Sequence, residues 1–226
     1  QITDSPYVVA STKLISRMGT SVLNILGAHT PFTTIAHSVG CPLLGQQDVP
    51  WPCNIDSRVI AMFPDEQLQI YSFGSAFGGN ALSSRASGGV RVASVLAHRE
   101  GWLAERMALM SVTSPEDKTI YIAAALPTHC GKTNLAMMVP TLPGWTVRCL
   151  SDHISWLRVD EDGRLFGINP ESGFFDIAPS TSTSHLPAVT TMQRNTLFVN
   201  VATTPEGDVW WEGMTPQPPP HLVDWT

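Results

Sequence analysis

The sequence predicts a mixed α/β (α+β) fold, with a strand–loop–helix unit in the middle of the chain and antiparallel hairpins after it. Three observations predict this fold class. Residues 119–139, TIYIAAALPTHCGKTNLAMMV, have the order of a strand, a phosphate-binding loop and a helix. Four later segments rich in β-branched and aromatic residues are separated by short turns. Residues 90–110 carry apolar side chains at helical spacing.

The N-terminal segments predict one strand, one short helix and a long loop. Residues 7–16, YVVASTKLIS, are rich in β-branched side chains and predict a strand. Thr20 is expected to cap a short helix over residues 21–27. Residues 28–54 contain several Pro and Gly residues and no clear period, which predicts mostly loop.

The next segments predict a hairpin, a flexible stretch and a helical region. RVIAMF at 58–63 and LQIYSF at 68–73 flank the residues Pro-Asp-Glu-Gln, which favours a β-hairpin. Residues 74–89, GSAFGGNALSSRASGG, are small and are expected to be flexible. Residues 90–110 predict one or two helices broken near Gly101.

The centre of the chain predicts the strand–loop–helix unit and one further strand. Residues 119–126 form a continuous apolar run, typical of a strand that is buried on both faces. A helix is expected over residues 132–139, where Pro140 stops it. WTVRCL at 145–150 predicts another strand, which ends at Ser151 and Asp152.

The C-terminal part predicts two antiparallel hairpins, each built around a turn with Gly as its last residue. Their strands are expected at residues 154–159 and 164–168, and at residues 196–202 and 208–213. Adjacent Trp210 and Trp211 face opposite sides of a strand. One is therefore expected in the core, and the other against protein outside this chain. The Pro-rich end predicts a loop.

Composition narrows the class of protein. The chain has 226 residues, 43% of them hydrophobic, but only 14% are charged, against roughly 25% in a typical soluble domain. This predicts that part of the surface lies against protein outside the chain. The net charge of -6 argues against nucleic-acid binding, and no apolar run approaches the roughly 18 residues of a membrane span. The four cysteines have no CxxC spacing, which predicts reduced thiols and a cytoplasmic protein.

The central loop lacks one residue of the usual phosphate-binding pattern. Gly131-Lys132-Thr133 is intact, but Leu126 stands where the first glycine belongs. Backbone N–H groups at a helix start favour anions, Lys132 adds a charge for the β- and γ-phosphates, and the Thr133 hydroxyl can hold a metal ion. Asp152, at the end of the next strand, is suited to a second metal contact. The alternative is a chance Gly-Lys-Thr with Lys132 as a solvated residue at the helix start.

Seven motifs together resemble the GTP-dependent phosphoenolpyruvate carboxykinases, in that family's order and spacing. They are HSVGCPL, GGNAL, EGWLAE, CGKTNLAMM, LPGW, INPESGFF and DVWWEG. The family loop ends in Ala-Cys-Gly-Lys-Thr without the first glycine, so Leu126 fits the family. The resemblance implies a phosphoenolpyruvate carboxykinase-like fold, of which this chain is a central fragment. Residues 1–97 would be the end of the N-terminal substrate-binding domain, and residues 98–226 the first part of the P-loop nucleotide-binding domain.

The resemblance also implies a reaction, its cofactors and its partners. The family converts oxaloacetate and GTP to phosphoenolpyruvate, CO2 and GDP in gluconeogenesis, with manganese or magnesium. The implied protein is a cytoplasmic monomer, without nucleic-acid or membrane partners. Implied catalytic residues are Cys130, Lys132 and Asp152. Implied phosphate-binding residues are Thr128, His129, Cys130, Gly131, Lys132, Thr133 and Asn134. Implied substrate-binding residues are Phe77, Gly78, Gly79, Arg85 and Thr128, of which Phe77 replaces a tyrosine and Thr128 a serine.

The family's catalytic manganese site is the place where this chain departs from the pattern. Thr133 and Asp152 match positions that serve the metals. The lysine, histidine and aspartate that ligate the catalytic ion fall on Ala86, Arg106 and His153. Of these only His153 can still be a metal ligand, because a guanidinium has no lone pair to give.

Two hypotheses follow from these departures. In the first, the chain is a segment of a carboxykinase with the family activity. In the second, it is a non-catalytic relative or inactive fragment that keeps phosphate contacts and lacks the manganese site.

Overall fold

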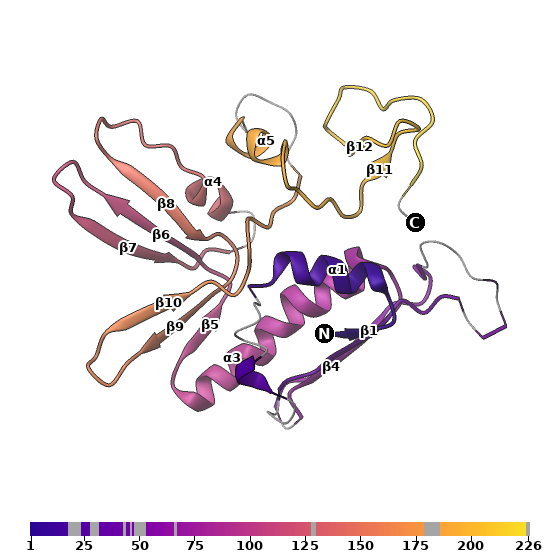
Figure 1. Cartoon of the computed structure of the whole chain (residues 1–226), viewed down its shortest axis with the longest axis horizontal. Coiled ribbons are helices and arrows are strands. Elements are labelled where there is room, and N and C mark those ends of the chain that lie inside the picture. Colours follow the sequence, from indigo (N-terminus) through magenta and orange to yellow (C-terminus); the bar gives the residue numbers. More distant parts are fainter. Residues whose placement is uncertain are drawn as a thin grey trace.

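Within its described residues, the computed structural model of this chain combines four small sheets with several short helical segments (Figure 1). The structure describes residues 1–17, 24–27, 32–42, 44–45, 47, 53–65, 67–127, 130–178 and 186–224. Within these residues no helix is both long and apolar enough to cross a lipid bilayer. The mixed α/β fold class predicted from the sequence is confirmed.

The N-terminal sheet has the strand order β1-β2-β4-β3. It consists of β1 (Ile2–Thr3), β2 (Ile35–Ser38), β4 (Gln69–Phe73) and β3 (Val59–Phe63). β1, β2 and β4 are parallel, and β3 pairs antiparallel with β4 from Val59 opposite Phe73 to Phe63 opposite Gln69. The predicted hairpin is therefore confirmed. Within residues 28–54, predicted as mostly loop, β2 is a strand that sequence reasoning missed.

The prediction of a strand at residues 7–16 is wrong, because this segment is helix α1 (Pro6–Ile15). Ser5 caps the helix by accepting a hydrogen bond from the Val8 N–H at 3.3 Å, and Pro6 occupies the first turn, where its missing N–H costs nothing. Val8 and Ser11 are one turn apart and both buried. The start signals and this buried face outweigh the weak strand preference of β-branched residues.

The predicted helix at residues 21–27 lies partly outside the described residues. Residues 24–26 are helical, whereas Thr20 and residues 21–23 belong to the undescribed part.

The stretch at residues 74–89, predicted to be flexible, forms two turns, η1 (Phe77–Ala81), whose backbone is non-helical at Gly78 and Gly79, and the π-helical η2 (Ser84–Gly88). Phe77, Ala81 and Ser84 are buried, and Phe77 and Ala81 pack with Val8 of α1 in a hydrophobic core cluster. Small residues fit here because the turns pack against β4, where a side chain at Gly88 would meet Ile70 at 2.9 Å.

Helix α3 (Gly89–Glu100) follows η2 directly and ends at Gly101, whose φ of 77° is the left-handed conformation that favours glycine. The predicted helix and its break are confirmed. The alternative of a second helix after Gly101 is wrong, because the chain continues there as β5 (Leu103–Glu105) and β6 (Ala108–Thr113).

The central sheet has the order β7-β6-β8, and all its pairs are antiparallel. It contains β7 (Thr119–Ala124) and β8 (Thr146–Ser151) on either side of β6. Strands at 119–126 and 145–150 were predicted, but burial of β7 on both faces was wrong. β7 is an edge strand, with Ile120 60% and Tyr121 71% exposed. Helix α4 (Lys132–Ala136) contacts β6 and β8 and ends three residues earlier than predicted.

The third sheet, β10-β9-β5, confirms the first C-terminal hairpin. β9 (Ser155–Val159) pairs antiparallel with β10 (Leu165–Ile168), and β5 joins the other side of β9. After helix α5 (Leu186–Met192), the second hairpin is smaller than predicted, because only β11 (Ala202–Thr203) and β12 (Val209–Trp210) pair. Trp210 and Trp211 are both half-buried, and Trp211 stacks on Phe198.

Candidate functional site

The loop between β7 and α4 carries the phosphate-binding motif. Gly131 stands at the N-cap of α4 with φ 87° and ψ 23°, a left-handed conformation that explains why a glycine is needed there. Among the described residues, a side chain at this glycine would meet no atom within 4 Å, so the backbone angle is the demand that these residues place on it. Thr128 and His129, predicted to bind phosphate and substrate, lie outside the described residues.

Lys132 closes this loop on itself. Its Nζ donates a hydrogen bond to the Leu126 carbonyl oxygen at 2.7 Å and a longer one to the Pro127 carbonyl oxygen at 3.5 Å. The backbone carbonyl at the position of the absent first glycine therefore holds the lysine, a contact that does not depend on the leucine side chain. A phosphate that enters the loop must draw Lys132 away from these neutral acceptors, to which a charged oxyanion is the stronger competitor.

Asp152 is placed by β8, which ends one residue before it. Only 4% of Asp152 is exposed, and its Oδ2 accepts a hydrogen bond from the Phe175 backbone N–H at 2.8 Å. Burial raises the pKa of Asp152 to about 6, although the hydrogen bond from Phe175 opposes the shift. The carboxylate is thus held by the segment that follows β10, and its suggested metal contact stays a prediction.

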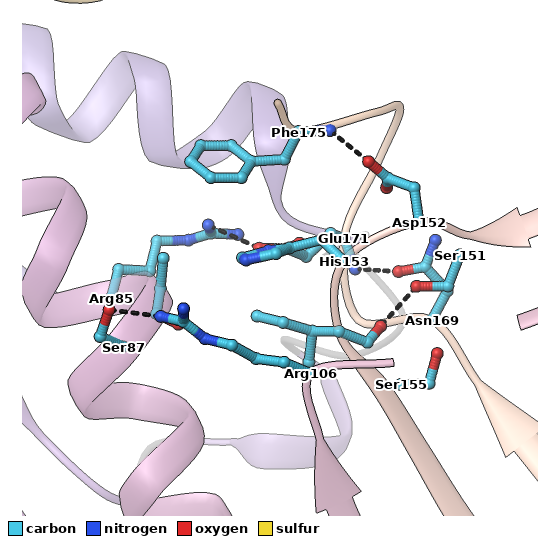
Figure 2. A network of polar contacts seen from close by, with 12 residues as sticks. Arg85, Ser87, Arg106, Ser151, Asp152, His153, Ser155, Asn169, Glu171 and Phe175 are labelled. Carbon is cyan, nitrogen blue, oxygen red and sulfur yellow. Dashed lines mark hydrogen bonds and ion pairs between the residues drawn. The ribbon is translucent and has the colours of Figure 1, made fainter. Parts of the chain in front are cut away.

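Glu171 is the centre of a buried ionic cluster that also contains Arg85 and His153 (Figure 2). Its Oε1 accepts from Arg85 Nη1 at 2.8 Å, and its Oε2 lies 3.1 Å from His153 Nδ1. Burial by itself would raise the pKa of Glu171, but the hydrogen bond with His153 and the charge of Arg85 outweigh it and lower that pKa below its usual value. Glu171 is therefore ionised at neutral pH.

Arg106 lies beside the same cluster and contacts η2. Its Nη2 donates to the Ala86 carbonyl oxygen at 3.1 Å and makes a short hydrogen bond to Ser87 Oγ. Figure 2 shows Arg85 and Arg106 extending toward one region from opposite sides, with the His153 ring beside Glu171. The contacts thus bring together all three positions that the family resemblance assigns to manganese ligands.

These residues do not fit a divalent metal ion. Ala86 offers only its backbone carbonyl, which is bonded to Arg106, and the imidazole of His153 is engaged with Glu171. Arg106 brings a fixed positive charge, which repels a cation and has no lone pair. Across the described part of the chain, no group of three or more His, Cys, Asp or Glu side chains is arranged to hold a metal.

The predicted substrate positions Phe77, Gly78 and Gly79 have clear packing roles. Phe77 is 2% exposed and meets Tyr7 edge to face at 6.2 Å between ring centroids. A side chain at Gly78 would collide with the Asn200 side chain, and one at Gly79 with Ser75 Oγ, where φ is also 61°. The positive φ favours glycine at 79, whereas a side chain at 78 needs only a shift of the Asn200 side chain, and substrate contact at both positions stays a prediction.

Glu171 is the site residue that sequence reasoning missed. It lies inside INPESGFF, one of the motifs that carry the family resemblance. Asn169 Oδ1 accepts from the Glu171 N–H at 2.8 Å, and Asn169 Nδ2 donates to the Leu150 carbonyl oxygen. The signal available in the sequence was an acidic residue two positions after this anchoring asparagine.

Comparisons with known proteins match both halves of the chain. Residues 1–98 match the model of the phosphoenolpyruvate carboxykinase N-terminal domain, and residues 102–226 match that of the phosphoenolpyruvate carboxykinase C-terminal P-loop domain. Proteins named phosphoenolpyruvate carboxykinase [GTP] from Chlamydia caviae and Corynebacterium glutamicum are each 51% identical over the whole chain, and one from Chlamydia felis is 50% identical. The chain spans only 38% or 37% of the length of these relatives.

Proposed function

This chain belongs to the GTP-dependent phosphoenolpyruvate carboxykinase family, and we propose that it supplies the nucleotide-phosphate loop and part of the substrate face of such an enzyme. The reaction proposed for the parent protein is the conversion of oxaloacetate and GTP to phosphoenolpyruvate, CO2 and GDP. Its place would be gluconeogenesis in the cytoplasm, and its partners would be these small molecules.

The division at residue 97 into a substrate-binding part and a nucleotide-binding part is also proposed. It is supported by the two ranges, 1–98 and 102–226, that match separate domain models.

One observation carries the proposal for nucleotide binding: strand β7, the loop, left-handed Gly131 and helix α4 follow one another in the described order, with Lys132 folded over the loop. Because α4 is a single short turn, its dipole adds little, and the charge of Lys132 is the main attraction for phosphate. Thr133 is proposed to hold the metal that travels with the nucleotide, and Cys130 and Asn134 to line the phosphate path.

A second candidate function is favoured by Arg106. The guanidinium, together with Ala86 and His153, replaces the family's ligands for the catalytic ion, so no catalytic step can be assigned to a metal there. In this alternative the chain binds nucleotide phosphate without turnover. Both candidates share the phosphate loop and differ in whether phosphoenolpyruvate is released.

A titration with GTP and magnesium tests the shared part. By isothermal titration calorimetry we expect weak binding, with a dissociation constant of about 1 mM. This corresponds to a binding free energy on the order of 4 kcal/mol. Lys132→Ala should abolish the heat of binding. The control is Lys118→Ala, an exposed lysine in the turn between β6 and β7, which should bind like the unchanged chain. Equal binding by the Lys132→Ala variant would refute the phosphate loop.

Turnover separates the two candidates. Phosphoenolpyruvate release from oxaloacetate and GTP, with manganese present, is expected from a full-length protein with the family's ligands. In a protein that keeps Ala86, Arg106 and His153, release of phosphoenolpyruvate supports the first candidate, and no release supports the second. Turnover that depends on manganese would instead favour the catalytic reading.

A further inference from the structure

A cavity of about 880 Å³ lies on one face of the β10-β9-β5 sheet, next to the end of α3. Its volume is within the range of small-molecule binding sites, which is roughly 300–1,000 Å³. Figure 1 shows β9 and β10 at the outer edge of the molecule, and β5 between them and α3. None of the described residues that line the cavity belongs to the phosphate loop or to the cluster around Glu171. The cavity is therefore separate from both.

Aromatic side chains form the floor of this cavity. Trp102 and Trp156 meet with their ring centroids 5.6 Å apart and their planes tilted by 55°. In the register of β9 and β10, Trp156 and Phe166 point to the same face of the sheet. The other face is occupied, since a side chain at Gly167 would meet Leu109 of β6 at 2.7 Å. Aromatic surface is thus left open on the side away from β6, and Phe166 is 53% exposed there.

Trp102 is held in place by the end of α3. Gly101, with a φ of 77°, turns the chain back, so that the Trp102 backbone N–H donates to the Ala97 carbonyl oxygen at 2.9 Å. The indole Nε1–H donates to Glu100 Oε2 at 2.7 Å. The polar atom of this ring is therefore satisfied within the chain, and its flat face is available to a ligand.

Acidic side chains dominate the charge around the aromatic floor. The lining contains four carboxylates, Glu100, Asp160, Glu161 and Asp162, against one guanidinium, that of Arg158. Asp160 Oδ1 accepts a hydrogen bond from the Asp162 backbone N–H at 3.0 Å, which orders the turn between β9 and β10. Because negative charge exceeds positive charge in the lining, the cavity favours a cationic ligand.

We propose that this cavity binds a small organic cation of the quaternary ammonium class. A cation over the faces of Trp and Phe rings is attracted by their π electrons, and the carboxylates at the rim add a longer-range attraction. A quaternary ammonium has no N–H to satisfy, so the apolar ring surface can cover its methyl groups. Arg158 opposes the ligand as a like charge. The site goes beyond the proposed function, whose nucleotide and carboxylate substrates are anions.

Choline is the probe for this site, and its neutral control is dimethylbutanol, in which an uncharged carbon replaces the nitrogen. Each is titrated into the whole chain, and the indole N–H signals of its seven tryptophans are followed by NMR. We expect saturable shifts with choline at Trp102 and Trp156. Dimethylbutanol should bind at least about fivefold more weakly, because it lacks the charge that the rings attract.

Variants of the rim charges should change the choline affinity in opposite directions. Glu100→Gln keeps an acceptor for Trp102 and removes one negative charge, so it should weaken binding about threefold. Arg158→Gln removes the like charge and should strengthen binding by about the same factor. Glu206→Gln, in the exposed turn between β11 and β12, is the matched control and should bind choline like the unchanged chain.

Trp156→Leu tests the aromatic floor and should weaken choline binding at least about fivefold. Its control is Trp145→Leu, at a 39% exposed tryptophan outside the cavity. If Trp156→Leu does not fold, the two charge variants decide, because both positions are exposed. Equal affinity for choline and dimethylbutanol, or no saturable shift at Trp102 and Trp156, would overturn the proposal. Unchanged binding in a folded Trp156→Leu variant, or effects of equal sign in the two charge variants, would overturn it as well.

Discussion

Replacing Glu171 by Gln should destabilise this chain more than any other single loss of charge in the cluster. Glu171 neutralises Arg85 at 2.8 Å and contacts His153 at 3.1 Å, and the three side chains are only 9% to 13% exposed. Gln keeps the shape and one acceptor but leaves the Arg85 charge unpaired. Removing one partner of a buried ion pair costs roughly 3–5 kcal/mol. We expect about 3 kcal/mol, because the Gln carbonyl still accepts one hydrogen bond.

Chemical denaturation followed by tryptophan fluorescence measures this free energy of unfolding. For a chain of this length, a loss of about 3 kcal/mol lowers Tm by roughly 6–12 °C. Glu161→Gln, in the exposed turn between β9 and β10, is the control and should stay within about 0.5 kcal/mol of the unchanged chain. The double variant Arg85→Met with Glu171→Leu should recover much of the loss, because no buried charge remains unpaired. A Glu171→Gln variant as stable as the control would refute the ionic cluster.

Three further predictions concern other parts of the chain. Burial raises the pKa of Asp152 from 3.8 to about 6, so the free energy of unfolding should fall by about 3 kcal/mol as pH rises from about 3 to about 7. Asp152→Asn should remove this fall in denaturation curves taken across that range, and an identical fall in the variant would exclude Asp152 as its source. At pH 8, iodoacetamide should label exposed Cys130 at least about tenfold faster than Cys149, because burial raises the pKa of Cys149 to about 11. Peptide mass spectrometry measures the two labelling rates, and faster labelling of Cys149 than of Cys130 would contradict the prediction. Ser5→Ala should cost about 1 kcal/mol by removing the cap of α1, while Ser5→Asp should cost little; equal losses in both variants would mean that capping is not the cause.

Local patterns predicted most of the regular elements, and they failed where distant contacts decide. The hairpins at 58–73 and 154–168 were predictable because turn residues and alternating side chains lie within one short segment. Helix α1 (Pro6–Ile15) was not, because its β-branched residues favour a strand while the helix start is marked only by Ser5 and Pro6. Strand β2 was missed because both of its partners, β1 and β4, lie more than 30 residues away.

The candidate site was predictable as a set of positions but not as a set of contacts. The motifs located Ala86, Arg106 and His153. In the structure Arg106 contacts the Ala86 carbonyl, and Glu171 links His153 to Arg85, the neighbour of Ala86. The sequence did not reveal that Glu171 joins Arg85 to His153, because Glu171 is 86 residues away from Arg85 along the chain. Nor did the sequence reveal that β7 is an exposed edge strand. A continuous apolar run has the same pattern whether or not other residues of the chain cover it.

Electron paramagnetic resonance of manganese, titrated without nucleotide, most directly tests whether the catalytic metal site has been replaced. The unmodified chain should leave the signal of free manganese unchanged, because Arg106 repels the ion and Ala86 offers no side-chain ligand. The combined variant Ala86→Lys, Arg106→His and His153→Asp, in a full-length protein, should bind the ion and diminish that signal. Tight binding of manganese by the unmodified chain, equal to that of the combined variant, would contradict the replacement.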